Sequence, residues 1–392
     1  MIDIDKVRAD TPACEQVLHF NNAGASLMPR QVYEAVKGVL DLENSVGGYE
    51  AERRLADDLQ SFYSEFAALL NARPDEIAFV ENATRAWDMA FYALPLQSGD
   101  RIITHGSEYA SNFLAFLHQA KRRGIEIDIA PSDESGQLDV AALETLIRPA
   151  TKLIAITHVP TQGGLVNPAA AVGQVAKKHN ILYLLDACQS AGQLEVDVKA
   201  IGCDILSGTG RKFLRGPRGT GFLYVSNAIV EKLDPPFIDL LSANWTTNDQ
   251  YELAAGAKRF ENWESYVGGR VGLMTAVRYA RSIGIAVIEQ RVSSLAATLR
   301  DALCGEAGVS VHDLGRTKCG IVTFQKQGLE PQNIAERLRA QQINVSVSGV
   351  PYARLDLGGR GLSSLVRASV HYFNTEKEIE RFVEIVSSLI PT

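Results

Sequence analysis

Two short apolar runs in the middle of the chain, each leading to one charged residue, constrain the fold more than any other feature. The first run, residues 181–185, reads ILYLL and ends at Asp186. An uninterrupted apolar run of this length is typical of a strand buried on both faces of a parallel sheet. The second run, residues 203–209, leads into a loop that contains Lys212. Because open α/β sheets bind ligands beyond the carboxyl ends of their strands, Asp186 is predicted to lie at a ligand site.

An alternation of strand and helix patterns surrounds these runs and predicts a parallel sheet covered by helices. Strands are predicted at residues 77–80, 101–105, 125–130, 151–157, 181–185, 203–209 and 222–225. The alternation then breaks, and residues 234–256 are predicted as a loop. From residue 309 onward the pattern changes to α+β. We therefore expect a large α/β domain at residues 15–260, with residues 1–14 and 261–392 in a small α+β domain.

The composition argues against several function classes. The 392-residue chain has a net charge of −7, whereas nucleic-acid-binding proteins present a basic face. No apolar run approaches the ~20 residues that cross a bilayer, and the polar start MIDIDKVRAD is not a signal peptide, so we expect a cytoplasmic protein without membrane contact. The scattered histidines predict no metal site. Five cysteines without paired spacing are predicted to be reduced thiols: Cys14, Cys188, Cys203, Cys304 and Cys319.

Lys212 allows two interpretations. Most lysines lie on the surface, and this one follows Arg211 and precedes the turn at residues 216–219, so it fits a basic surface loop. In a desolvated pocket, burial and the charge of Arg211 would instead lower the pKa of the amine and make it nucleophilic toward a carbonyl. The upstream acid, Asp186, and the small residues 207–210 favour the second interpretation.

The sequence around Lys212 resembles the lysine signature of the class V aminotransferase group, which uses pyridoxal 5'-phosphate (PLP) and includes cysteine desulfurases and several C–S lyases. The resemblance rests on Cys203-Asp204-Ile205-Leu206, Thr209-Gly210-Arg211-Lys212 and Gly219-Thr220-Gly221, and it covers nearly the whole chain. It implies fold type I, with a mixed, mostly parallel sheet, helices on both faces and a smaller α+β C-terminal domain. It also implies PLP as cofactor, an amino-acid substrate and a homodimer.

The resemblance assigns roles to residues of the two central runs. Lys212 is implied as the Schiff-base lysine, and Asp186 as the acidic partner of the pyridinium nitrogen. The other implied cofactor contacts in this region are Gln189 near the ring hydroxyl, Thr209 and Ser207 on the phosphate, and Arg211 beside the lysine.

A second phosphate contact is predicted where the strand at residues 77–80 meets a helix. Free N–H groups and the helix dipole favour an anion at such a helix start. A plain helix cap by Asn82 or Thr84 explains the pattern equally well. The family has a similar Ala-Thr pair at this place, which implies that Ala83 and Thr84 bind the cofactor phosphate.

Two positions depart from the pattern of the family. Glu108-Tyr109 stands where the family commonly has Glu-His, so Tyr109 is implied as the aromatic residue that stacks on the cofactor ring and takes part in catalysis. A tyrosine packed on the core at a capping turn is the alternative. Thr161 stands where desulfurases carry an asparagine beside the ring hydroxyl, and Gln162 is the alternative to Thr161 for that role.

Arg367 is the strongest candidate for substrate binding. It lies among apolar residues in a predicted strand, where it either faces outward or, if buried, needs an anion. The sequence Arg367-Ala368-Ser369, followed by Asn374-Thr375, matches the family motif that holds the α-carboxylate of the substrate. The family also has a small-residue loop near that carboxylate, which implies contacts from Ala23 and Gly24.

The cysteines separate the sub-branches of the family. Desulfurases carry a mobile cysteine in a loop shortly before the carboxylate arginine, and the matching residues 346–354 contain none. The chain looks more like the C–S lyases, including the hercynylcysteine sulfoxide lyases, in residues 46–49, 211–219 and 260–264. We therefore expect β-elimination from a cysteine derivative. Transamination or epimerisation is the alternative, and a desulfurase or a scaffold without turnover is less favoured.

Overall fold

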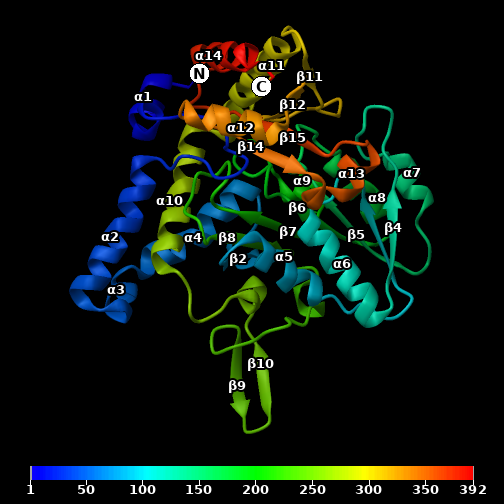
Figure 1. The fold of residues 1–392 in the computed structure, drawn as a ribbon. Coiled ribbons are helices and arrows are strands. Elements are labelled where there is room, and N and C mark those ends of the chain that lie inside the picture. Colours follow the sequence, from blue (N-terminus) through cyan, green and yellow to red (C-terminus); the bar gives the residue numbers. More distant parts are fainter. Residues whose placement is uncertain (1, 392) are drawn as a thin grey trace.

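A computed structural model describes residues 2–391, and its centre is a seven-stranded sheet (Figure 1). The strand order is β2-β8-β7-β6-β5-β3-β4. Strand β8 pairs antiparallel with both neighbours and every other pairing is parallel, which confirms the predicted mixed, mostly parallel sheet. The strands are β2 (Ile77–Val80), β3 (Arg101–His105), β4 (Glu126–Ala130), β5 (Thr151–Thr157), β6 (Leu182–Asp186), β7 (Ile205–Thr209) and β8 (Gly221–Val225).

Helices cover both faces of this sheet because its strands are apolar on both sides. Along β6, Leu185 packs in one core and its neighbour Leu184 in the other, since successive side chains of a strand point to opposite faces. Helices contributing to the first core are α2 (Arg30–Val46), α4 (Ala56–Leu70), α7 (Val140–Thr145), α8 (Ala169–Lys178), α9 (Val198–Ile201) and α10 (Val267–Ile283), and those contributing to the second are α5 (Ala83–Tyr92) and α6 (Ala110–Arg123).

A four-stranded antiparallel sheet forms a smaller α+β unit from the C-terminal part of the chain, as predicted. Its strands lie in the order β11-β12-β15-β14, and its helices enclose a separate apolar core. The elements are α11 (Ile285–Cys304), β11 (Val309–Val311), β12 (Ile321–Lys326), α12 (Pro331–Ala340), β14 (Ser346–Gly349), α13 (Arg354–Gly359), β15 (Ser364–Ser369) and α14 (Glu376–Ser388).

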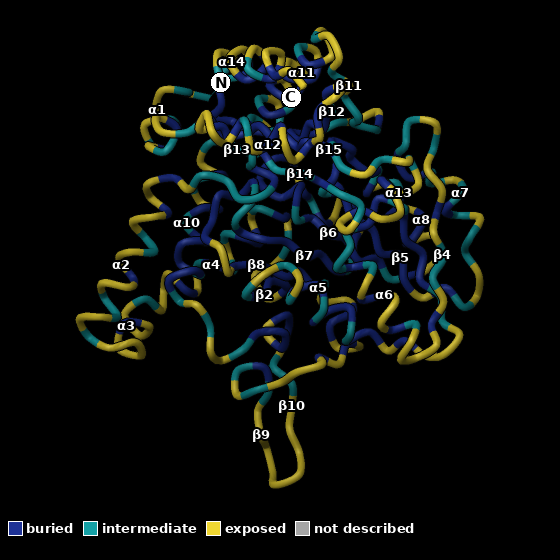
Figure 2. The backbone as a smooth tube through the Cα atoms, viewed as in Figure 1, coloured by how far each residue is buried: buried dark blue, intermediate teal, exposed yellow. Residues whose placement is uncertain are grey.

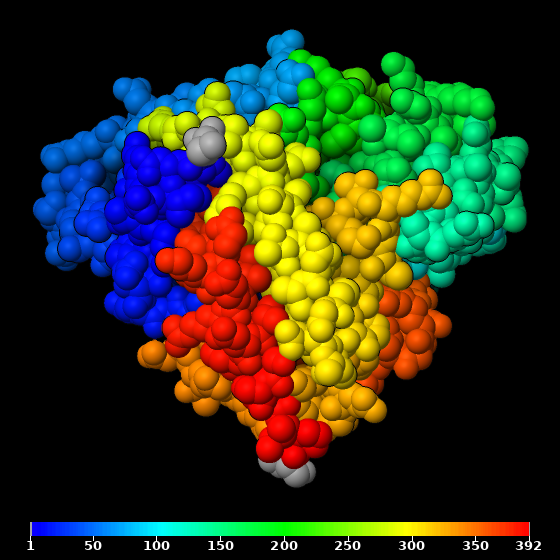
Figure 3. Space-filling view, turned by 90° about the horizontal axis from the view of Figure 1, so that it is seen from above, coloured from blue at the N-terminus to red at the C-terminus, as the bar shows by residue number. Residues whose placement is uncertain are grey.

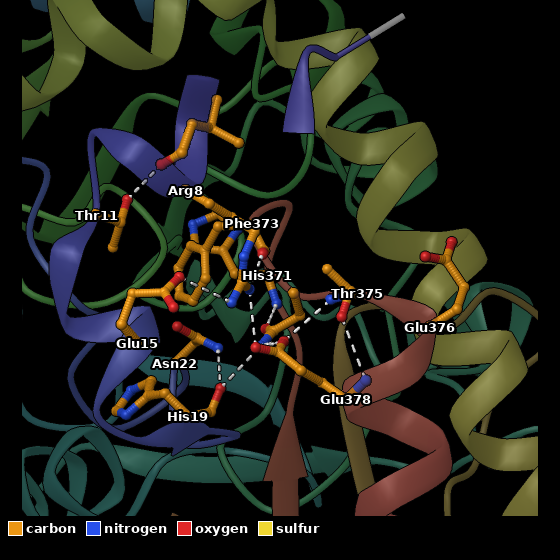
Figure 4. Close-up of polar contacts among 12 residues, drawn as sticks. Arg8, Thr11, Glu15, His19, Asn22, His371, Phe373, Thr375, Glu376 and Glu378 are labelled. Atoms are coloured by element: carbon orange, nitrogen blue, oxygen red, sulfur yellow. Dashed lines mark hydrogen bonds and ion pairs between the residues drawn. The ribbon is translucent and has the colours of Figure 1, made fainter. Parts of the chain in front are cut away.

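The N-terminal residues pack against this smaller unit. Strand β1 (Leu18–His19) pairs in parallel with β13 (Ile343–Asn344). Arg8, in α1 (Ile4–Ala9), donates hydrogen bonds to the Glu378 carboxylate at 2.8 Å and to the Phe373 carbonyl at 3.1 Å (Figure 4). Figure 3 shows the N-terminal segment beside α14 on the same face.

The predicted domain boundary at residue 260 stays a prediction. The helix just beyond it, α10, contributes Val271 and Val277 to the core of the large sheet, whereas Ala280 near its end lies in the core of the smaller unit. This packing favours counting most of α10 with the large domain.

Residues 234–256, predicted as a loop, contain a β-hairpin, so that prediction was wrong. Strand β9 (Ala243–Thr247) pairs antiparallel with β10 (Gln250–Leu253), and the hairpin extends away from the body (Figure 2). Most of its residues are exposed, so it lacks the alternating apolar pattern by which a strand is identified in a sequence. The remaining elements are α3 (Gly48–Arg54) and the 3-10 helices η1 (Pro12–Glu15), η2 (Pro74–Glu76), η3 (Val230–Lys232), η4 (Gly256–Phe260) and η5 (Val350–Tyr352).

In residues 2–391, no single helix is long and apolar enough to cross a membrane. Only α10 and α11 taken together reach that length and composition, and they meet at a bend of 80°. The same residues contain no group of three His, Cys, Asp or Glu side chains that could hold a metal ion.

Candidate active site

A cavity of about 260 Å³ lies where β5, β6 and β7 end, at the carboxyl edge of the large sheet. Open α/β sheets bind their ligands at this edge. A larger hollow, of about 1250 Å³, lies at the opposite edge where β5 and β6 begin, and none of the candidate residues lines it. The walls of the smaller cavity contain Asn82, Ala83, Thr84, Tyr109, Thr157, Val159, Thr161, Asp186, Cys188, Gln189, Thr209, Arg211, Lys212 and Gly219.

Lys212 lines this cavity, and the residue is half-buried. Burial lowers the pKa of its amine to about 8, and the nearby charges of Arg211 and Arg367 act in the same direction. None of the described residues accepts a hydrogen bond from Lys212 Nζ. The amine is therefore free to react and, near neutral pH, deprotonates far more readily than an ordinary lysine.

This environment predicts how the protein without cofactor captures PLP. We expect the capture rate to rise with pH up to about 8 and then level off, because only the neutral amine of Lys212 attacks an aldehyde. Stopped-flow absorbance of the cofactor measures the rate, with Lys212→Arg as the variant that should show no capture. A rate that keeps rising toward pH 10.5, the value of an ordinary lysine, would contradict the predicted environment.

Asp186 is held in place at the end of β6 by two hydrogen bonds. Its Oδ1 accepts from the Cys188 N–H at 2.8 Å, and its Oδ2 accepts from Asn112 Nδ2 at 2.8 Å. The carboxylate is 4% exposed and forms no ion pair with any described residue. A buried carboxylate without a cation suits a ligand that brings a protonated nitrogen.

The part of the cavity that suits an anion lies between the start of α5 and the end of β7. Asn82 caps α5 by accepting a hydrogen bond from the Arg85 N–H at 2.9 Å, and Ala83 and Thr84 form the first turn of that helix. Thr209 lines the cavity from β7. Ser207, two residues earlier, is buried in β7 and does not line the cavity, so its role stays a prediction.

Thr161 and Gln162 point to different partners. Thr161 lines the cavity, and its hydroxyl accepts hydrogen bonds from Gln189 Nε2 at 3.3 Å and from Arg367 Nη1 at 2.8 Å. Gln162 donates instead to Asp356 in α13, at 2.9 Å. The geometry therefore favours Thr161 over Gln162 as the residue near the ring hydroxyl.

Arg367 lies in β15 and is only 7% exposed. Its side chain is therefore buried and does not face outward into solvent. Burial, together with the charge of Arg211, lowers the pKa of its guanidinium to about 10. Its Nη1 donates to Thr161, and its buried Nε has no partner in residues 2–391. A buried cation paired only with neutral atoms suits an anionic ligand such as a carboxylate.

The loop of residues 21–26 forms part of the same wall. The Ala23 carbonyl accepts a hydrogen bond from Gln189 Nε2 at 3.1 Å, and the Gly24 carbonyl accepts one from Arg211. A Cβ at Gly24 would lie 2.5 Å from the Asn21 side chain, so a larger residue does not fit without a shift. Both residues lie beside the cofactor-site candidates, and their contact with substrate stays a prediction.

The unpartnered polar atoms of this cavity fit PLP. Within residues 2–391, Gln189 Oε1 is buried without a partner, Asp186 has no cation paired with it, and Lys212 donates to no acceptor. An amine, a carboxylate and an anion-binding helix start in one cavity match the aldehyde, ring nitrogen and phosphate of this cofactor. Lys212 would hold the aldehyde, Asp186 the ring nitrogen, and Ala83, Thr84 and Thr209 the phosphate.

Several residues that line the cavity were not predicted as site residues, and Cys188 is the one among them with a reactive side chain. The sequence predicts Cys188 only as a reduced thiol, and the structure shows that it lines the cavity close to Lys212 and Asp186. Its place two residues after Asp186, at the same strand end, was the available signal. Burial raises the pKa of its thiol well above the ordinary value, and the charge of Asp186 adds to the effect, so the thiol stays protonated.

Comparison with known proteins agrees with this site. Residues 18–382 match the family described as "Aminotransferase class-V". A probable cysteine desulfurase of Pyrococcus abyssi is 30% identical, over 98% of this chain and 97% of that protein. The apo structure of a cysteine desulfurase from Thermococcus onnurineus, 28% identical, has a TM-score of 0.92 and covers 99% of this chain and 98% of the other. A cystine C–S lyase in complex with its product cysteine persulfide, 23% identical, shares the fold with a TM-score of 0.88, over 97% of this chain and 100% of the other.

Proposed function

The chain belongs to the class V aminotransferase family and is a PLP-dependent enzyme of fold type I, and from this premise we propose that it catalyses β-elimination at a C–S bond of a cysteine derivative. The observation that carries the proposal is the cavity that places the Lys212 amine beside Asp186 and near the buried cation of Arg367. These three residues suit a reaction in which the α-proton of an amino acid is removed while its carboxylate is bound.

Each of these residues has a separate task. Arg367 binds the substrate carboxylate and so orients the α-carbon. When bound, PLP withdraws electrons from that carbon and lowers the cost of removing its proton. Lys212 Nζ is the base that takes this proton, and its lowered pKa keeps the amine available near neutral pH. Asp186 would hold the ring nitrogen of bound PLP and keep it protonated.

The position of the cysteines supports elimination over sulfur transfer through a persulfide. The residues that precede Arg367 form β14, η5 and α13, and residues 346–359 contain no cysteine. Cys188 is the only cysteine among the residues that line the cavity, and its raised pKa keeps it a thiol rather than a nucleophilic thiolate.

Product analysis tests the proposal. The purified holoenzyme is incubated with cystine, cysteine S-conjugates and cysteine sulfoxides, and pyruvate, ammonia and the sulfur product are measured. We expect equal amounts of pyruvate and ammonia from at least one of them. Alanine as the product would support a desulfurase. A keto acid that needs an amino acceptor would support transamination, and loss of optical activity alone would support epimerisation.

Arg367 variants test the assignment of the carboxylate site. We expect Arg367→Ala to raise KM by about 10- to 100-fold, the factor for losing a hydrogen bond to a charged group, with a smaller effect on kcat. Arg367→Lys keeps the charge but cannot form a bidentate contact with the carboxylate, so its KM should lie between those of the wild type and Arg367→Ala. Arg354→Ala, at an exposed residue of α13, is the matched control. An unchanged KM in Arg367→Ala would remove this assignment.

We also propose that the protein forms a homodimer, as the family resemblance implies. Large apolar side chains are exposed on the hairpin and on the segments at its base: Phe237, Leu240, Trp245, Tyr251 and Trp263. Exposed apolar surface of this kind is typical of protein interfaces. Light scattering should give twice the mass of one chain, and Trp245→Ser with Leu240→Ser should shift the mass toward that of the monomer. A monomer at all concentrations would contradict the proposal.

A further inference from the structure

A second buried carboxyl group, that of Glu108, lies behind Asp186. Glu108 precedes α6 and is 4% exposed. Asn112, four residues later and one turn along, places its side-chain amide between the two acids. Asn112 Nδ2 donates to Glu108 Oε1 at 2.9 Å and to Asp186 Oδ2 at 2.8 Å. One amide group, with its two hydrogens, therefore joins the two carboxyl groups.

The other partners of Glu108 are all neutral. Glu108 Oε1 accepts from the Tyr109 N–H at 2.8 Å and contacts the Thr157 hydroxyl, and Oε2 lies 3.2 Å from the Thr104 hydroxyl. None of the ion pairs formed within residues 2–391 includes Glu108. Two negative charges joined by one amide in a buried site, without a cation, repel each other strongly.

One proton resolves this repulsion, and the contacts indicate which acid carries it. Oε1 of Glu108 already accepts two N–H hydrogen bonds, which suits the carbonyl oxygen of a protonated acid, and Oε2 contacts the hydroxyl of Thr104, a group that can accept as well as donate. Both oxygens of Asp186 accept N–H hydrogen bonds, which suits the charged form. Burial, reinforced by the charge of Asp186, outweighs the hydrogen bonds from Thr157 and Asn112 and raises the pKa of Glu108 to about 7.

We propose that Glu108 is a positioning residue for the cofactor: it holds a proton and, through Asn112, fixes Asp186 as the charged carboxylate that faces the ring nitrogen of PLP. The proposal rests on the cofactor and not on the reaction class, so a failed elimination assay would leave it intact.

The proton on Glu108 makes the site sensitive to pH. The groups around Glu108 come from four elements: Thr104 on β3, Thr157 on β5, Asp186 on β6 and Asn112 on α6. Asp186 is the charged group among them. His105, at the end of β3, has its pKa lowered to about 4 by burial and stays neutral near pH 7. As pH rises through about 7, Glu108 loses its proton and adds a negative charge next to Asp186. That charge makes the surroundings of Asp186 more negative and so favours the protonated form of the PLP ring nitrogen.

Glu108→Gln tests the proposal because the amide has nearly the same shape and cannot lose a proton. We expect the absorbance spectrum of bound PLP in the wild-type protein to change with pH around 7, and this step to be absent in Glu108→Gln. PLP should still bind to the variant, since no cavity residue is altered. Glu76→Gln is the matched control, because Glu76 is also a buried acid that accepts backbone N–H hydrogen bonds and lies outside the cavity.

A second measurement needs neither cofactor nor activity. Infrared spectra of the apoprotein should show the carbonyl band of a protonated carboxylic acid that disappears as pH rises through about 7, and Glu108→Gln should lack this band. If Glu108→Gln does not fold, wild-type apoprotein labelled with ¹³C at the glutamate carboxyl carbon gives the same information by NMR. A glutamate that titrates near 7, well above the ordinary 4.5, supports the proposal. No such glutamate, or an unchanged pH step in Glu108→Gln, would overturn it.

Discussion

Replacing Lys212 with alanine is expected to lower kcat by about 10²- to 10⁴-fold, the contribution of a positioned general base, and to abolish covalent attachment of the cofactor. Both effects follow from the loss of the Lys212 amine. Lys212 Nζ is the only lysine amine among the residues that line the cavity, and burial lowers its pKa to about 8. Turnover with substrate and the absorbance of bound cofactor measure the two effects separately.

The control for this variant is Lys199→Ala, at an exposed lysine of α9. It should retain both turnover and cofactor attachment. Addition of a small primary amine should restore part of the activity of Lys212→Ala, because the missing group is a base in an otherwise intact cavity. Turnover by Lys212→Ala near the wild-type rate would show that another group removes the α-proton.

Asp186→Asn is expected to lower kcat by about 10²- to 10³-fold, the effect of removing one preorganised electrostatic contact. The variant has the same shape but loses the negative charge, and it loses one of the two N–H hydrogen bonds because an amide nitrogen cannot accept it. Without that charge the ring nitrogen of PLP is not kept protonated, and the cofactor withdraws electrons from the substrate less strongly. The absorbance of bound cofactor reports the change in protonation, and steady-state kinetics report the change in rate.

A matched control exists at the other edge of the same sheet. Asp204 is an acid next to β7 that accepts a hydrogen bond from the Tyr183 N–H at 2.9 Å, and it does not line the catalytic cavity. Asp204→Asn should lower stability without a comparable loss of kcat per folded molecule. If the two variants lost the same activity, the special role of Asp186 would be refuted.

The sequence predicted the parts of the site that follow from strand ends. Asp186 and Lys212 each follow an apolar strand, and parallel neighbouring strands bring their carboxyl ends to one edge, so the pattern alone placed Asp186 at a ligand site. The resemblance added the roles of Arg367 and Thr161, and the structure places both side chains in hydrogen-bond contact with each other.

Contacts that depend on side-chain direction could not be predicted in the same way. Nothing in the order of residues shows that Asn112 reaches both Glu108 and Asp186, because that requires the distance between α6 and β6. The sequence predicts Cys188 as a reduced thiol, and only the geometry shows that it borders the cavity. The hairpin of β9 and β10 was missed because it has no buried face.

The most direct test of the account is to reduce the holoenzyme with borohydride, digest it and map the peptides by mass spectrometry. Reduction makes the bond between the cofactor and its lysine permanent, so the modified residue is identified without any assumption about the reaction. We expect one phosphopyridoxyl group per chain, on Lys212. A phosphopyridoxyl group on another lysine, with Lys212 unmodified, would contradict the account.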